Sequence, residues 1–133
     1  MKRFVDTNVF IYSVTGHPRF GEGARRILKC IEEGEEAVTS TLVLCEVSWV
    51  LEAMGRQGDI KSVLEKILSF RNLEVVKFDV DDLLVGASNM EFYGVDFNDG
   101  LNVAVMTRIG VSEVYSNDVK HLGKIDFLKL IFE

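Results

Sequence analysis

This 133-residue sequence contains two kinds of segment, short strand-like runs and longer helix-like ones, and together they predict an α/β fold. Short runs rich in apolar and β-branched residues alternate with longer segments in which apolar side chains recur at helical spacing. Strands that alternate with helices in this way pair in parallel, and the helices cover both faces of the sheet. We therefore expect a three-layer α/β/α sandwich with a parallel sheet of about five strands. The length predicts a single domain over residues 1–133.

Five short segments are expected to be strands. The first is apolar in its second half, and the third is rich in β-branched side chains, which favour a pleated sheet. The others are brief apolar segments between helical patterns. In chain order, the expected strands are residues 2–5, 37–39, 73–78, 113–116 and 128–132.

Six segments are expected to be helices. The second has apolar side chains at positions 24, 27, 28 and 31, which lie on one helical face. Ser40 or Thr41 can cap the third helix and Asp59 the fourth, because side-chain oxygens accept hydrogen bonds from a first turn. Glycine follows most of these helices and favours their ends there. In chain order, the expected helices are residues 8–14, 23–33, 41–54, 59–70, 81–93 and 98–109.

The composition indicates a globular protein without a membrane segment. The chain is 47% hydrophobic and 27% charged, and no apolar stretch reaches the roughly 20 residues that span a bilayer. Asp6 interrupts the first apolar run, which argues against a secretory signal. We expect a cytoplasmic protein with Cys30 and Cys45 as buried thiols. A zinc site is not expected, because there is no CxxC and His17 and His121 lie far apart in sequence.

Two acids interrupt apolar segments. Asp6 directly follows the first strand, where its ordinary role would be to cap the next helix. In open α/β sheets, however, ligands bind at the carboxyl ends of the strands. Glu46 is the only charged residue in residues 42–51, and burying an unpaired carboxylate costs several kcal/mol or leaves it protonated. Glu46 therefore lies either on a narrow exposed stripe or in a cleft, and we favour the cleft.

Three further acids lie near the expected ends of elements. Asp96 has the position of a helix cap, and Asp99 lies in the first turn of the same helix, where the helix dipole favours an acid. Asp118 follows a Ser-Asn pair, which by itself is typical of a turn. If the strands are parallel, however, Asp99 and Asp118 lie at the same edge of the sheet as Asp6.

Acids that meet at one sheet edge repel one another unless a cation lies among them. Oxygen ligands without cysteine or histidine suit Mg²⁺ or Mn²⁺. Such a cation activates water and neutralises charge on a phosphate, so the expected chemistry is hydrolysis of a phosphodiester bond. The net charge of −6 is not typical of a nucleic-acid binder, but it becomes −2 when four cation-binding acids are left out of the count.

Four segments together carry a family resemblance. They are Phe4-Val5-Asp6-Thr7-Asn8, Glu46 in the helix after the second strand, Val95-Asp96-Phe97-Asn98-Asp99-Gly100-Leu101, and Tyr115-Ser116-Asn117-Asp118. In this order and spacing they resemble the PIN domain, the nuclease fold of VapC-type toxins, and the match covers essentially the whole chain. Gly100 and Ser116 depart slightly from the family, in which alanine is usual and threonine is common at these positions.

The resemblance implies a catalytic acidic site that holds Mg²⁺ or Mn²⁺. Its members would be Asp6, Glu46, Asp99 and Asp118. Asn8 and Ser116 would orient these carboxylates through hydrogen bonds, and Asp96 would be a supporting acid or a ligand. The implied activity is metal-dependent endoribonuclease cleavage of RNA. The usual setting is a toxin–antitoxin pair, in which a small antitoxin protein blocks the active-site groove.

Within this site we expect Asp6, Glu46 and Asp99 to hold one ion, with Asp118 completing that site or helping a second ion. Because water would attack the phosphorus, the products would carry a 5′-phosphate and a 3′-hydroxyl. Cations on the rim should offset the repulsion between RNA and the acids. The candidates are Arg3, Arg19, Arg25, Arg26 and Lys120. For the adjacent arginines of the second helix, we favour the simpler interpretation of a solvated helix face.

The helices at residues 41–54 and 59–70 carry more apolar positions than one sheet face should cover. Some of these side chains could form a homodimer or antitoxin surface, or they could be ordinary core. The candidates are Leu44, Trp49, Leu51 and Met54. We expect a homodimer because proteins that resemble this chain form pairs.

Other functional classes need different residues. A phospho-receiver domain needs paired acids after the first strand and an acceptor aspartate after the third, and neither is present. A haloacid-dehalogenase-type phosphatase needs a second aspartate two residues after the first, where this chain has Asn8. Two alternatives within the same fold stay open. One is an RNA-processing nuclease without an antitoxin, and the other is a non-catalytic binding module, against which the full set of acids weighs.

Overall fold

Five strands form one parallel sheet in the computed structural model, which describes residues 2–132. The strands are β1 (Arg3–Val5), β2 (Ala37–Ser40), β3 (Leu73–Val76), β4 (Glu113–Tyr115) and β5 (Lys129–Ile131). Their order in the sheet is β3-β2-β1-β4-β5. The chain therefore builds outward from β1 on one side and then returns to add β4 on the other. The direction of building reverses between β1 and β4.

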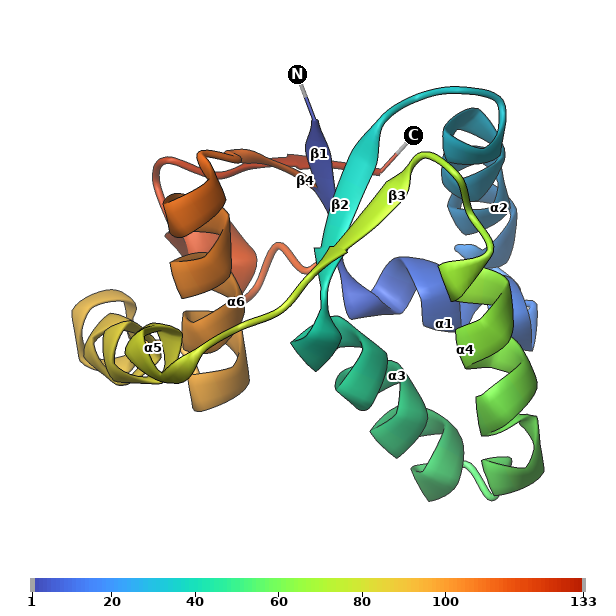
Figure 1. The fold of residues 1–133 in the computed structure, drawn as a ribbon, viewed down its shortest axis with the longest axis horizontal. Coiled ribbons are helices and arrows are strands. Elements are labelled where there is room, and N and C mark those ends of the chain that lie inside the picture. The colour runs from blue at the N-terminus through green and yellow to red at the C-terminus, as the bar shows by residue number, and fades with distance from the viewer. Residues whose placement is uncertain (1, 133) are drawn as a thin grey trace.

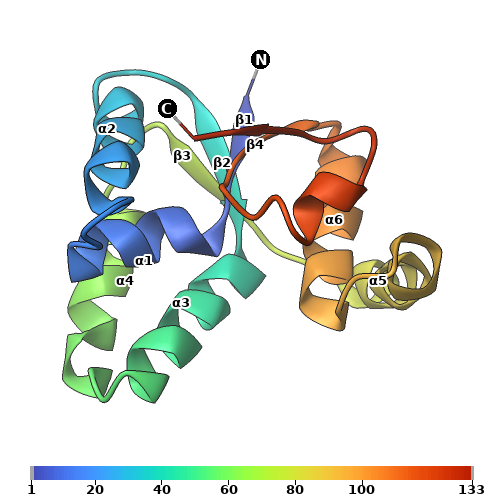
Figure 2. The ribbon, with the colours of Figure 1, turned by 180° about the vertical axis from the view of Figure 1, so that it is seen from behind.

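Helices cover both faces of this sheet, which confirms the predicted three-layer α/β/α architecture (Figure 1). They are α1 (Thr7–Thr15), α2 (Gly21–Glu32), α3 (Thr41–Ala53), α4 (Ile60–Leu68), α5 (Val80–Tyr93) and α6 (Phe97–Ile109). Helices α1 to α4 lie on one side, and α5 packs against α6 on the other (Figure 2). Two short 3₁₀ turns, η1 (Gln57–Asp59) and η2 (Leu122–Lys124), complete the chain. None of the helices within residues 2–132 is long and apolar enough to cross a bilayer.

Of the two caps predicted for α3 and α4, one is confirmed. The Ser40 hydroxyl accepts a hydrogen bond from the backbone N–H of Val43 at 3.1 Å, which caps α3. The prediction for Asp59 is wrong, because its carboxylate instead accepts a hydrogen bond from Arg56 Nε at 2.9 Å. A 3₁₀ turn precedes α4 at this point and changes the direction in which the carboxylate faces.

The core lies between the sheet and the inner faces of the helices. Both cysteines were predicted to be buried, and this prediction is wrong, because Cys30 and Cys45 are exposed. In α2 the buried face runs through Ile27 and Ile31, and in α3 it runs through positions 43, 47 and 51. Each cysteine lies outside the buried face of its helix although its sequence neighbours are apolar. An apolar neighbourhood therefore did not predict whether the cysteine itself is buried.

Helices α5 and α6 approach each other closely at two glycines. A Cβ atom added to Gly100 would lie 2.5 Å from the backbone oxygen of Gly86. One added to Gly86 would lie 3.0 Å from the Cα of Leu101. This backbone contact accounts for glycine at position 100, where the family resemblance leads one to expect alanine.

We predict that Gly100→Ala destabilises the protein by about 1–3 kcal/mol, because the added methyl group must push two backbones apart. The loss should occur although alanine favours a helix over glycine by about 1 kcal/mol. Urea unfolding measures the change. Gly58→Ala is the control, because a Cβ there meets no atom within 4 Å. Equal stability of both variants would mean that α5 can move away from α6 at little cost.

Candidate metal centre

The predicted acids gather where the strand order reverses. Asp6 follows β1 and Asp118 follows β4, which are the two strands that flank the reversal. Asp99 lies in the first turn of α6, and α6 leads into β4, so its N-terminus lies at the same edge of the sheet. Glu46 lies in α3, which starts at this edge directly after β2.

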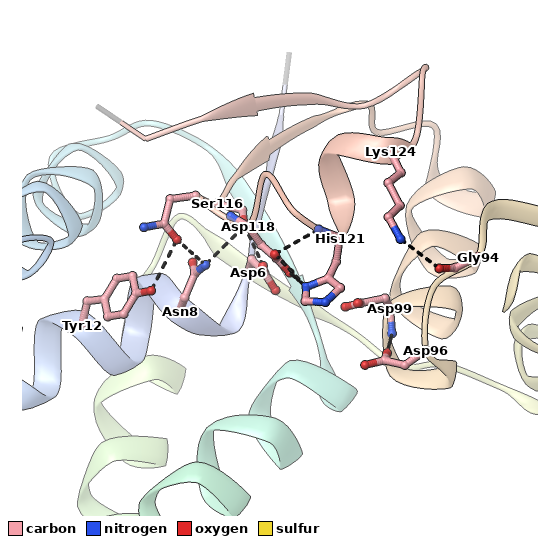
Figure 3. A network of polar contacts seen from close by, with 11 residues as sticks. Asp6, Asn8, Tyr12, Gly94, Asp96, Asp99, Ser116, Asp118, His121 and Lys124 are labelled. Carbon is pink, nitrogen blue, oxygen red and sulfur yellow. Dashed lines mark hydrogen bonds and ion pairs between the residues drawn. The ribbon is translucent and has the colours of Figure 1, made fainter.

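All four acids line one cavity of about 220 Å³. The complete lining consists of Asp6, Thr7, Asn8, Ile11, Tyr12, Glu46, Val50, Asp99 and Asp118. Residues that are 112 positions apart in the sequence therefore face the same space. Figure 3 shows the side chains of Asp6, Asp99 and Asp118 in this region.

Asp6 both caps a helix and faces the cavity. Its Oδ1 accepts a hydrogen bond from the Thr7 N–H at 2.8 Å. Its Oδ2 accepts one from the Ser116 hydroxyl at 2.7 Å, and Figure 3 shows these two side chains next to each other. Burial raises the pKa of the Asp6 carboxyl, and the negative charge of Asp118 raises it further. The hydrogen bonds from Ser116 and Thr7 lower this pKa, but they offset the effect of burial only in part.

The Ser116 hydroxyl links two of the acids. It donates to Asp6 and accepts a hydrogen bond from the backbone N–H of Asp118 at 3.1 Å. Asn8 donates to the Ser116 oxygen at 3.4 Å and to the Asn117 side-chain oxygen at 2.7 Å. None of the described hydrogen bonds joins Asn8 to a carboxylate, so its influence passes through these two neighbours. The side-chain oxygen of Asn8 is buried, and no hydrogen-bond partner is found for it among the described residues.

Glu46 is held by two residues that the sequence analysis missed. Its Oε1 accepts hydrogen bonds from Thr7 Oγ1 and from Asn102 Nδ2, both at 3.0 Å. Asn102 is only 4% exposed, and its own oxygen accepts a hydrogen bond from the Ser40 hydroxyl at 2.8 Å. Burial raises the pKa of Glu46 and the charge of Asp6 adds to this effect, whereas the bonds from Asn102 and Thr7 oppose it. The sequence could have indicated a role for Asn102, because it is the only polar residue in the apolar run at residues 101–106.

Asp96 and Asp99 have different environments. Asp96 is exposed and caps α6, because its Oδ1 accepts a hydrogen bond from the Asp99 N–H at 2.9 Å. Asp99 faces the cavity, and its pKa is raised from 3.8 to about 7. Burial is the largest cause of this shift, followed by the charges of Asp96, Asp6, Asp118 and Glu46.

A histidine lies beside two of these acids, although the sequence analysis expected oxygen ligands alone. Within residues 2–132, a single set of three acid or histidine side chains places one ligand atom each within 4.8 Å of the others, and it consists of Asp99, Asp118 and His121. The expected trio of Asp6, Glu46 and Asp99 is less tightly grouped in the structure. The sequence analysis missed His121 because it considered the histidines only as a pair for zinc. Its position three residues after Asp118 in a turn could have indicated that the two side chains meet.

These residues fit a divalent cation. Carboxylate oxygens from four chain segments converge on one cavity, and oxygen ligands suit Mg²⁺ and Mn²⁺. The raised pKa values of Asp6, Glu46 and Asp99 have burial and mutual repulsion as their causes. A cation would relieve that repulsion. Asn8 lines the same cavity, and its buried side-chain oxygen has no hydrogen-bond partner among the described residues.

We predict that the metal-free protein loses stability as the pH rises from about 4 to about 7. Over this range the folded protein retains the Asp99 proton, whereas the unfolded chain releases it. The folded state therefore binds more protons, and the free energy of unfolding falls as the pH increases. Urea unfolding in the presence of EDTA at a series of pH values measures the slope. Asp99→Asn should flatten it, and an unchanged slope in this variant would contradict the assignment.

The basic side chains proposed to bind RNA have different positions in the structure. The prediction for Arg3 is wrong, because its guanidinium donates at 2.9 Å to Glu113 in the first residue of β4, at the end of the strand away from the cavity. Arg25 lines a different cavity between α1, α2 and α4. Arg26 lies 3.8 Å from Glu22 on an exposed helix face, as the simpler interpretation predicted. Lys120 is exposed and lies two residues after an acid of the site, so it stays a candidate.

The sequence and the fold match known proteins. The PIN domain family matches residues 3–128. The search of curated proteins returned no significant match.

Solved structures share this fold over nearly the whole chain. VapBC2 from Rickettsia felis, bound to a DNA fragment from its promoter, has a TM-score of 0.73 at 20% identity, with 98% of each chain covered. VapC20 from Mycobacterium tuberculosis, a toxin that cleaves the sarcin-ricin loop, has a TM-score of 0.73 at 19% identity, with 92% of this chain and 94% of that chain covered. DNA-bound VapBC from Salmonella typhimurium has a TM-score of 0.71 at 18% identity, with 98% of each chain covered.

Proposed function

This chain belongs to the PIN domain family, and from that premise we propose that it is a metal-dependent endoribonuclease. The observation that carries the proposal is the convergence of four carboxylates on one cavity at the point where the strand order reverses. A module that only binds partners would not need several buried or half-buried acids with raised pKa values. Among the described structures, VapC20 is a toxin that cleaves an RNA loop, which supports RNA as the substrate class.

The side chains of the site divide into two groups. Asp6, Glu46, Asp99 and Asp118 would hold Mg²⁺ or Mn²⁺. When bound, the ion would neutralise phosphate charge and make water a better nucleophile. Ser116 fixes one oxygen of Asp6, and Thr7 with Asn102 fixes one oxygen of Glu46. These hydrogen bonds hold the two carboxyl groups in one orientation at the cavity before substrate arrives.

The test is cleavage of single-stranded and structured RNA by the purified protein in Mn²⁺, in Mg²⁺ and in EDTA. We expect cleavage only with a divalent ion and products with 5′-phosphate and 3′-hydroxyl ends, because water would be the nucleophile. Cleavage that persists in EDTA, or products with 2′,3′-cyclic phosphates, would contradict the proposal. Those products would mean that the ribose hydroxyl attacks.

We further propose that the protein is the toxin of a toxin–antitoxin pair. Several structures that share its fold are complexes of this kind, including a toxin-antitoxin complex from Klebsiella pneumoniae with a TM-score of 0.70 at 14% identity. A nuclease that processes RNA without an antitoxin is the second candidate. The neighbouring gene distinguishes the two. A small adjacent frame that encodes a DNA-binding protein and silences the nuclease supports the toxin, and its absence supports RNA processing.

Exposed apolar side chains on α3 support a protein partner. Trp49 is 52% exposed and Met54 is 50% exposed, whereas Leu51 is fully buried and belongs to the core. Leu44 is partly buried and lines a shallow apolar groove with Trp49 and residues of α4. We propose that this α3–α4 face joins two copies of the chain in a homodimer.

We predict that Trp49→Glu shifts the protein from dimer to monomer, because a charge placed at the centre of an apolar contact is desolvated on association. Sedimentation velocity at micromolar concentration measures the change. Phe92→Glu on α5 is the matched control, because Phe92 is also an exposed aromatic residue, at 82% exposure. Dissociation by Phe92→Glu with no effect of Trp49→Glu would place the dimer contact on the opposite layer.

A further inference from the structure

His121 lies beside two acids of the metal centre, Asp99 and Asp118. Its backbone N–H donates to Asp118 Oδ1 at 3.2 Å, and its ring Nδ1 lies 2.9 Å from the same oxygen (Figure 3). The backbone and the ring of His121 therefore both contact Asp118, although the side chain is 46% exposed. One ring nitrogen, one Asp99 oxygen and one Asp118 oxygen all lie within 4.8 Å of one another. That spacing is compatible with three ligands around one ion.

From this arrangement we infer that His121 supplies a nitrogen ligand to the metal centre, which therefore takes Mn²⁺ in preference to Mg²⁺. The inference rests on the proposed metal site and adds a ligand and a metal preference to it. The centre would then hold an imidazole beside Asp99 and Asp118, in addition to the carboxylates of Asp6 and Glu46. In this arrangement His121 adds a ligand, and all four carboxylates keep their proposed roles.

The hydrogen bond to Asp118 leaves His121 able to bind an ion. When the ring donates its Nδ1–H to a carboxylate, Nε2 keeps its lone pair for a metal. Histidines that bind metals usually donate their second N–H in this way, which fixes the ring and makes the free nitrogen more basic. Both Asp118 oxygens lie near Nδ1, at 2.9 and 3.2 Å, and an ionised carboxylate has further lone pairs with which to bind an ion.

A nitrogen ligand changes which ions the site favours. Mg²⁺ requires oxygen ligands in a near-ideal octahedron and keeps several waters. First-row transition metals accept imidazole together with carboxylates. A centre built from carboxylates alone would bind both classes, whereas one that includes His121 discriminates against Mg²⁺.

The other histidine provides a matched control. His17 accepts hydrogen bonds on Nδ1 from the backbone N–H groups of Arg19 and Phe20, both at 3.1 Å. Its ring also lies against Tyr12 and Phe20. His17 therefore has a local structural role, and its replacement should leave the metal centre unchanged.

Pulsed electron paramagnetic resonance of the Mn²⁺-loaded protein tests the inference directly. We expect ¹⁴N coupling in the wild type and in His17→Gln, and its loss in His121→Gln. Titrations should show that His121→Gln weakens Mn²⁺ binding by more than about 10–100-fold, the loss typical when only an outer-shell partner of a ligand is removed, and changes Mg²⁺ binding much less. Absence of ¹⁴N coupling in a wild type that binds Mn²⁺ would overturn the inference.

An equal loss of Mn²⁺ and Mg²⁺ affinity in His121→Gln would also overturn it, because His121 would then only position Asp118. Wild-type protein that cleaves RNA with Mn²⁺ but has no nitrogen ligand would refute the inference and leave the nuclease function standing. Failure of the wild type to bind Mn²⁺ would refute both, whereas ¹⁴N coupling without RNA cleavage would refute only the nuclease function. The melting temperature of each variant without metal confirms that the fold is retained.

Discussion

Asp6→Asn is expected to remove nearly all metal-dependent RNA cleavage while the fold persists. Asparagine has nearly the same shape; its oxygen can still accept the hydrogen bond from Thr7, and its amide NH2 can donate to the Ser116 oxygen in place of the bond that Ser116 now donates, so the local structure should be kept. What it removes is the charge that would bind the cation at the switch point of the sheet. We expect a loss of about 10²–10³-fold in kcat, the size found when one group that stabilises transition-state charge is removed.

The same variant should not be less stable than the wild type in the absence of metal. Burial raises the pKa of Asp6, so its ionised form destabilises the folded state above its ordinary pKa. The neutral amide avoids that cost, and the melting temperature at pH 7–8 in EDTA should be equal or higher. Asp81→Asn on α5 is the control, because it removes one exposed charge outside the cavity. If Asp6→Asn and the wild type cleave RNA equally, the cleavage comes from a contaminant.

Glu46→Gln is expected to remove most of the stabilisation that Mn²⁺ gives to the wild type. A ligand at a hundredfold excess over its Kd stabilises the folded state by about 2.7 kcal/mol, which corresponds to several degrees in Tm. Glutamine keeps an oxygen that can accept the hydrogen bonds from Thr7 and Asn102, so the change isolates the charge. The measurement is a melting scan with and without Mn²⁺.

Glu52→Gln is the control for this experiment, because Glu52 is exposed on the same helix. It should keep the full response to Mn²⁺. A full response in Glu46→Gln would mean that the ion binds without Glu46, and the cation would then be held by the Asp99, Asp118 and His121 set alone.

The fold was largely predictable because each element depends on local patterns. Helical spacing in α2 and the β-branched run of β3 are properties of neighbouring residues. The alternation of strands and helices then restricts the sheet to parallel pairing. Parallel pairing places every strand's carboxyl end at one edge, which is why Asp6 and Asp118 could be expected to meet.

The wrong predictions share one physical cause, which is the direction in which a side chain points from its helix, strand or turn. Both cysteines lie in apolar sequence, but a small rotation around the helix axis decides whether a position is buried or exposed. Arg3 is near Asp6 in sequence, yet it lies at the opposite end of the same strand. Asp59 occupies a cap position, but the turn before α4 directs it to Arg56.

The sequence by itself determined the family, the order of the elements and the identity of the acids, because these follow from residue type and spacing along one chain. The tertiary structure alone decided which groups hold the acids in place. Asn102 reaches Glu46 across 56 positions, and Ser116 reaches Asp6 across 110. Hydrogen bonds over such separations depend on how helices pack against the sheet, to within a fraction of an ångström. The pairing of His121 with Asp118 is local, but its place beside Asp99 comes from the meeting of α6 with the turn after β4.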